Sequence, residues 1–103
     1  MNYKLIVSEQ ADRNIKEIIE YVAVRLNNPE AARNIISEIE EVYDKLEDNA
    51  EGYTYCSDPF LASKGYRKIF LKKCRYVVLY IVKDNEAQIS GVFHILEDYA
   101  KKL

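Results

Sequence analysis

The stretch SEQADRNIKEIIEYVAVRLNNPEAARNIISEIEEVYDKL, residues 8–46, decides the fold of this 103-residue chain. Its apolar residues recur at spacings of three, four and seven, which predicts two amphipathic helices, the first about five turns long. Ser8 and Asn28 are suited to be N-caps, and Pro29 suits the first position of the second helix. Because the joint between the helices is so short, they are predicted to form an antiparallel hairpin.

Segments rich in β-forming residues flank the hairpin on both sides. Residues 3–7 predict a short strand before it. Residues 47–65 lose the helical period and gather Gly, Pro, Asn, Asp and Ser, so we expect a long loop there. Three strands should follow. Residues 66–72 alternate in polarity, residues 75–83 are apolar on both faces as in a central strand, and residues 87–96 alternate again.

The predicted element order is therefore β-α-α-β-β-β, with residues 1–103 forming a single domain. The apolar stripe of the hairpin needs an apolar sheet face to cover. We expect an α+β fold in which the hairpin packs on one face of a mainly antiparallel four-stranded sheet. The Lys and Arg side chains of the strands should then point from the other face. The tail after the last strand is expected to be only partly ordered.

The positive charge of the chain is concentrated in one place. The formal net charge is -2, yet residues 64–83 (KGYRKIFLKKCRYVVLYIVK) carry seven basic residues and no acidic one. Residues 1–63 hold six basic residues against thirteen acidic ones. We interpret the basic stretch as an outward sheet face on which RNA or an acidic partner segment docks. The alternative is a solvated face whose lysines keep the sheet from aggregating.

Several classes of protein are disfavoured by composition. No apolar run approaches the roughly 18 residues of a membrane span, and the N-terminus does not resemble a signal peptide, so we expect a cytoplasmic protein. Cys56 and Cys74 are expected to be reduced, structural thiols. With two Cys and one His, the sequence predicts no metal site, and no cofactor is expected.

Four features together resemble the RelE/ParE family of toxins from type II toxin–antitoxin systems. The opening strand leads straight into a helical hairpin with an Asn-Pro joint. A basic strand begins at residues 65–68 (GYRK), and residues 76–80 (YVVLY) are similar to the central strand of the family. The closing strand ends in residues 92–94 (VFH) and is followed by a polar tail with Asp98. The resemblance covers essentially the whole chain and implies the RelE/ParE-like fold.

The resemblance implies growth inhibition by one of two activities. RelE-like members are metal-free ribonucleases that enter the ribosome and cut mRNA, whereas ParE-like members inhibit DNA gyrase. In both cases a cognate antitoxin silences the toxin, and operator DNA is contacted only indirectly, through the antitoxin. Such modules are associated with plasmid stabilization. No membrane partner is implied.

Metal-free RNA cleavage needs an acid, a base and positive charge beside the reacting phosphate. The only histidine, His94, suits acid–base chemistry, although a hydrogen-bonded structural role is the alternative. Tyr99 can stack on a base or donate a proton. The candidate catalytic residues are therefore Lys72, Arg75, His94 and Tyr99. The candidate nucleic-acid or partner-binding residues are the cations Lys64, Arg67, Lys68, Lys72, Lys73 and Arg75.

Two departures from the family pattern bear on this activity. The central strand of the family usually reads Tyr-Arg, where this chain has Tyr76-Val77, and Arg75 lies about 7 Å along the strand from Val77. After His94 the family tends to have Gly-Arg-Arg, where this chain has Ile-Leu-Glu over residues 95–97. The leading hypothesis is a ribosome-dependent mRNA-cleaving toxin. The alternatives are a ParE-like gyrase inhibitor and a catalytically silent module that binds the antitoxin and acts as co-repressor.

Overall fold

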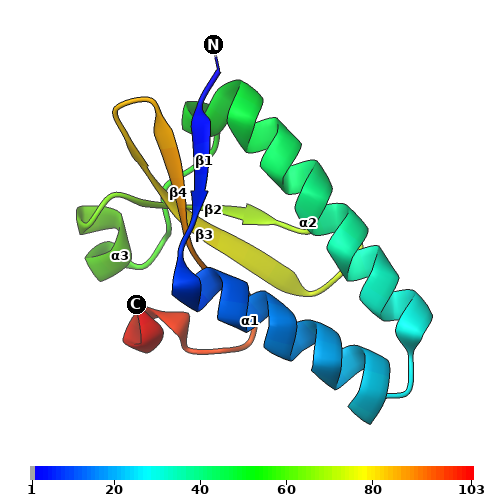
Figure 1. The fold of residues 1–103 in the computed structure, drawn as a ribbon. Coiled ribbons are helices and arrows are strands. Elements are labelled where there is room, and N and C mark those ends of the chain that lie inside the picture. The colour runs from blue at the N-terminus through cyan, green and yellow to red at the C-terminus, as the bar shows by residue number, and fades with distance from the viewer. Residues whose placement is uncertain (1) are drawn as a thin grey trace.

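A computed structural model describes residues 2–103 as two helices packed against a four-stranded sheet (Figure 1). The strand order is β1-β4-β3-β2, with β1 parallel to β4 and the other neighbours antiparallel. The predicted α+β fold is thus confirmed. The elements are β1 (Lys4–Val7), α1 (Glu9–Glu20), α2 (Pro29–Asn49), α3 (Pro59–Ser63), β2 (Tyr66–Phe70), β3 (Tyr76–Lys83) and β4 (Glu86–His94).

Both predicted N-caps are present. The Ser8 hydroxyl accepts a hydrogen bond from the Ala11 N–H at 3.0 Å, and Asn28 Oδ1 accepts one from the Ala31 N–H at 3.1 Å. Pro29 occupies the first turn of α2, where its missing N–H costs no helical hydrogen bond.

The first helix is not the uninterrupted helix that its period predicts. Regular α-helix stops at Glu20, and Tyr21–Arg25 form a π-helical turn. This turn keeps Val22 in the core while Val24, at 69% exposure, points to solvent. Asn27 then adopts a positive φ of 50°, which reverses the chain toward α2.

The predicted loop over residues 47–65 contains more structure than expected. The apolar stripe of α2 continues through Leu46 to Ala50, both buried, so the helix extends to Asn49 and ends in a 3-10 turn at Ala50–Gly52. Further on, the Asp58 side chain caps α3 by accepting from the Leu61 N–H at 3.0 Å. The tail likewise forms a 3-10 turn, Tyr99–Lys102.

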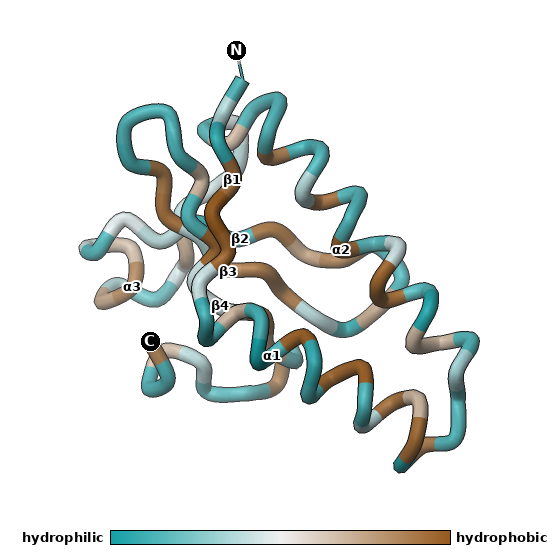
Figure 2. Tube along the Cα trace, in the orientation of Figure 1, coloured by the Kyte–Doolittle hydropathy of each residue, from teal (hydrophilic) through white to brown (hydrophobic). Residues whose placement is uncertain are grey.

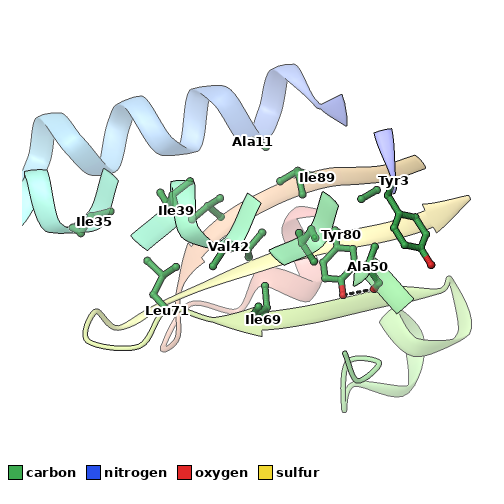
Figure 3. Packing of buried hydrophobic residues seen from close by; sticks show 14 of the residues in the cluster. Tyr3, Ala11, Ile35, Ile39, Val42, Ala50, Ile69, Leu71, Tyr80 and Ile89 are labelled. Atoms are coloured by element: carbon green, nitrogen blue, oxygen red, sulfur yellow. Dashed lines mark hydrogen bonds between the residues drawn. The ribbon is translucent and has the colours of Figure 1, made fainter. Parts of the chain in front are cut away.

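The main core lies between the hairpin and the sheet. Apolar and polar positions alternate along both helices (Figure 2), and the apolar ones face the strands. Ile39 and Val42 of α2 belong to the same buried cluster as Ile89 of β4. Tyr80 of β3 is fully buried there, and its hydroxyl donates to the Ala50 carbonyl at 2.8 Å (Figure 3). That bond secures the end of α2 over the sheet.

The other face of the sheet is also covered, which corrects the expectation of an open basic face. A second apolar cluster forms there around Val77, Leu79 and Phe93. The segment after α2 contributes Cys56 and Leu61 to this cluster. Side chains that are partly buried against it are Tyr66, Tyr99, Ala100 and Leu103. The sheet is therefore packed on both faces.

Candidate functional site

Arg67 of β2 is a structural cation rather than part of an open basic face. It lies opposite Tyr80 in the register of β2 and β3, and Tyr80 belongs to the hairpin-side core. Its guanidinium donates to the Tyr53 carbonyl at 2.6 Å and to the Glu51 carbonyl at 3.3 Å. It also covers the Tyr55 ring at 4.1 Å from the ring centroid. Arg67 thereby holds the segment that follows α2.

Lys72 and Lys73 lie in the turn after β2 and contact α2. Lys72 Nζ donates to Glu41 Oε1 at 2.9 Å, and the Lys73 N–H donates to Glu38 Oε1 at 2.9 Å. The hydrogen bond and charge of Lys72 lower the pKa of Glu41, and the same contact raises the pKa of Lys72. The predicted strand over residues 66–72 ends at Phe70, so Lys72 leaves the sheet and pairs with the helix.

Lys64, Lys68 and Arg75 are not held by carboxylates in this way. The ammonium of Lys64 lies 5.3 Å from the centroid of the exposed Phe60 ring, and that of Lys68 lies 5.4 Å from the Phe70 ring. Arg75 is exposed, and its carbonyl accepts the N–H of Ile95 at 3.0 Å. The candidate cations therefore differ in their surroundings, which range from backbone carbonyls and helix carboxylates to aromatic rings and solvent.

His94 is the last residue of β4 and lies opposite Tyr76, with their rings edge-to-face at 5.4 Å between centroids. Its Nδ1 accepts the Leu96 N–H at 3.2 Å, so Nε2 carries the proton in the neutral ring. The His94 N–H donates to Glu97 Oε1 at 2.9 Å. Burial raises the pKa of Glu97, but hydrogen bonds from Lys102 and His94 outweigh burial and lower it. Within residues 2–103 the His94 side chain is thus hydrogen-bonded through Nδ1, while no partner for its Nε2–H is found there.

Tyr99 does not lie with His94. Its ring stacks on Phe93 of the second apolar cluster, and burial raises the pKa of its hydroxyl. Successive residues of a strand point to opposite faces, so Phe93 and His94 diverge. His94 accordingly faces Tyr76, which packs against the hairpin-side core. The structure does not bring the four candidate catalytic residues into one cluster.

A pocket of about 430 Å³ opens between α1, the end of β4 and the C-terminal segment. Of the candidate site residues, it contains only His94. This pocket was not predicted from the sequence, because its wall combines segments that are far apart in the chain. The feature that could have indicated it is the pair of amide side chains, Gln10 and Asn14, beside the apolar stripe of the first helix. The wall residues are Gln10, Asn14, Glu17 and Ile18 of α1, Tyr21, Tyr76 of β3, Val92, Phe93 and His94 of β4, and Glu97 and Lys102.

Metal sites, membrane-spanning helices and disulfides are likewise not found in the described part of the chain. Among residues 2–103, no cluster of three or more His, Cys, Asp or Glu side chains is placed to hold a metal ion. In the same part of the chain, none of the helices has the length and apolarity to cross a membrane. Both cysteines are free thiols, Cys56 buried and Cys74 partly buried.

Comparison with known proteins agrees with this fold. The chain resembles a solved structure described as the chromosomal ParDE TA system from P. aeruginosa, with a TM-score of 0.73 and 23% identity over 89% of this chain and 95% of that one. It also resembles the YoeB dimer from Staphylococcus aureus, with a TM-score of 0.60 and 19% identity over 91% of this chain and 99% of that one. A search of curated proteins returned no match.

A family model extends the comparison from the fold to the sequence. The model for the ParE toxin of the type II toxin–antitoxin system parDE matches residues 5–99, nearly the whole chain. This match agrees with the resemblance found in the sequence. The chain therefore belongs to the ParE toxin family of type II toxin–antitoxin systems.

Proposed function

We propose that this toxin arrests growth by inhibiting DNA gyrase, as a protein-binding inhibitor that does not cut RNA. The observation that carries this proposal is the apolar closure of the second sheet face. Val77 occupies the position where the central strand of the family usually has arginine, and it is fully buried in the cluster that contains Phe93. A buried aliphatic side chain offers no charge to a phosphate in a transition state.

The surroundings of the other candidate residues support the same proposal. Tyr99 is packed on Phe93, Lys72 is paired with Glu41, and Arg67 is bonded to backbone carbonyls. A ribonuclease needs such groups directed at one phosphate and poised for proton transfer. In this chain Tyr99, Lys72 and Arg67 each contact another part of the fold instead. The match to the ParE toxin model supports the same proposal.

Growth arrest and gyrase activity test the proposal directly. The purified full chain is expected to block negative supercoiling of a relaxed plasmid by gyrase, while reporter mRNA from arrested cells stays intact in primer extension. The double variant Lys72→Ala/Arg75→Ala should remain toxic, because neither side chain is assigned to the target interface. Unimpaired supercoiling by gyrase at saturating toxin would refute the proposal.

Ribosome-dependent mRNA cleavage is the second candidate. The exposed Arg75 beside the end of β4 and the free Nε2–H of His94 favour it, since both side chains remain available to an anion. Cuts at codon boundaries that disappear in the Lys72→Ala/Arg75→Ala variant would establish this activity. Induction without growth arrest would instead indicate a silent module that only binds the antitoxin. Family membership implies a cognate antitoxin in all three cases.

A further inference from the structure

The 430 Å³ pocket beside α1 combines aromatic rings with carboxylates. Tyr76 and His94 form one wall with their edge-to-face rings, and Tyr21, at 49% exposure, stands at the end of α1. Glu17 and Glu97 contribute the acidic groups. Aromatic faces attract cations through their quadrupole, and carboxylates do so through charge. The pocket volume lies in the range of sites that hold small ligands or side chains.

One of the residues that line this pocket is itself a cation. Lys102 lines the pocket, and its Nζ is bound to Glu97 Oε2. The Lys102 carbonyl accepts a hydrogen bond from Gln10 Nε2 at 3.0 Å, which fastens the C-terminal segment beside the start of α1 (Figure 1). The Lys102 side chain is 52% exposed, so solvent and a competing ligand can reach the ion pair. The wall of the pocket thus already contains one ion pair between a lysine and a carboxylate.

From these contacts we infer that the pocket is a docking site for an arginine side chain presented by a partner protein, with Lys102 as the internal cation that the arginine displaces. A guanidinium is planar, stacks on aromatic rings and bonds a carboxylate through two parallel N–H groups. An ammonium such as that of Lys102 does neither. Arginine therefore gains stacking on Tyr76 and a second hydrogen bond to Glu97, neither of which Lys102 makes. This inference does not depend on whether gyrase or mRNA is the target.

Titration with a minimal probe tests the inference on the full-length chain. Acetyl-arginine amide is added while the side-chain NMR resonances of His94 and Tyr76 are followed. Acetyl-citrulline amide, which has nearly the same shape but no charge, is the matched ligand control. We expect the arginine probe to shift both resonances with a saturating curve and the citrulline probe to leave them in place. Equal shifts with the two probes would overturn the inference.

Three variants examine the displacement of Lys102. Lys102→Met removes the competing ammonium but keeps an apolar side chain, and it should tighten binding of the arginine probe about two- to fivefold, as expected for losing an exposed ion pair. Lys101→Met is the control, because Lys101 pairs with Asp98 and does not line the pocket. Glu97→Gln should weaken binding. Equal affinities in the Lys102 and Lys101 variants would show that Lys102 does not occupy the site and would contradict the inference.

Discussion

The rings of Phe93 and Tyr99 stack with their centroids 5.9 Å apart and their planes inclined by 17°. This contact joins the C-terminal segment to the sheet face opposite the helical hairpin. It also covers Val77, the residue that stands in place of the family arginine. One stacked pair therefore contributes both to the stability of the second apolar cluster and to the burial of the residue that replaces the family arginine.

Tyr99 is expected to act through packing, so its hydroxyl should be dispensable. Tyr99→Phe should leave both growth arrest and the free energy of unfolding nearly unchanged. Tyr99→Ala should lower the free energy of unfolding by about 2–4 kcal/mol, because it removes the stacked ring and leaves a cavity. Urea unfolding followed by circular dichroism measures both variants. A fully folded but non-toxic Tyr99→Phe would point to a chemical role for the hydroxyl instead.

Gly91 leaves the space into which the Phe93 ring extends. A Cβ at position 91 would lie 2.5 Å from a carbon of the Phe93 ring and 3.3 Å from Asn14 Oδ1. Gly91→Ala should displace Phe93 and lower the free energy of unfolding by about 1–3 kcal/mol through overpacking. The melting temperature measures the effect, with Ser90→Ala as the neighbouring control. An unchanged melting temperature in Gly91→Ala would mean that the Phe93 ring moves aside at little cost.

Arg67 and Lys68 are adjacent, but only Arg67 is expected to matter for stability. Arg67→Met removes donors to two backbone carbonyls and should lower the free energy of unfolding by about 1–3 kcal/mol. Lys68→Met loses only a contact with the Phe70 ring and should change it by no more than about 0.5 kcal/mol. Parallel denaturant titrations compare the two. Similar losses in both variants would contradict the structural role assigned to Arg67.

The Cys74 thiol is expected to be unusually unreactive. Its Sγ lies 3.1 Å from Glu38 Oε2, and burial together with this carboxylate raises the pKa of Cys74 from its ordinary value of 9.0 to about 11. Alkylation by iodoacetamide at pH 8.5 should therefore be slow. Glu38→Gln should lower the pKa of Cys74 and accelerate the reaction, whereas Glu40→Gln should not. Peptide mapping by mass spectrometry gives the rates; no acceleration in Glu38→Gln would rule out the carboxylate as a cause.

The raised pKa of Cys74 makes the stability of the folded chain depend on pH in the alkaline range. The pKa of Cys74 is higher in the folded chain than in the unfolded one, so the folded state holds its proton more tightly. Its contribution to stability is complete below about pH 9 and is lost as the pH rises toward 11. Burial raises the pKa of Tyr43 to about 12, so the loss of stability continues at higher pH. Stability should accordingly fall on the alkaline side.

The hairpin was predictable because its determinants are local. Caps at Ser8 and Asn28, a proline at the first helical position and a stripe of period 3.6 act within a few residues of one another. The π-helical turn at Tyr21–Arg25 was not predictable, because it depends on how Val22 reaches a core formed by distant strands. The same holds for the pocket, whose wall joins α1 to the end of the chain.

The sequence by itself determined the order of the four strands and the two long helices, the two caps and the family, all of which depend on patterns along the chain. Only the tertiary structure decided where the positive charge lies. Arg67 contacts carbonyls on the hairpin side, Lys68 lies over Phe70, and Lys72 pairs with Glu41, 31 residues away. Neighbouring side chains of a strand point to opposite faces of the sheet, so each of them contacts the segment that packs on its own face. Charge that is contiguous in sequence is therefore divided in space.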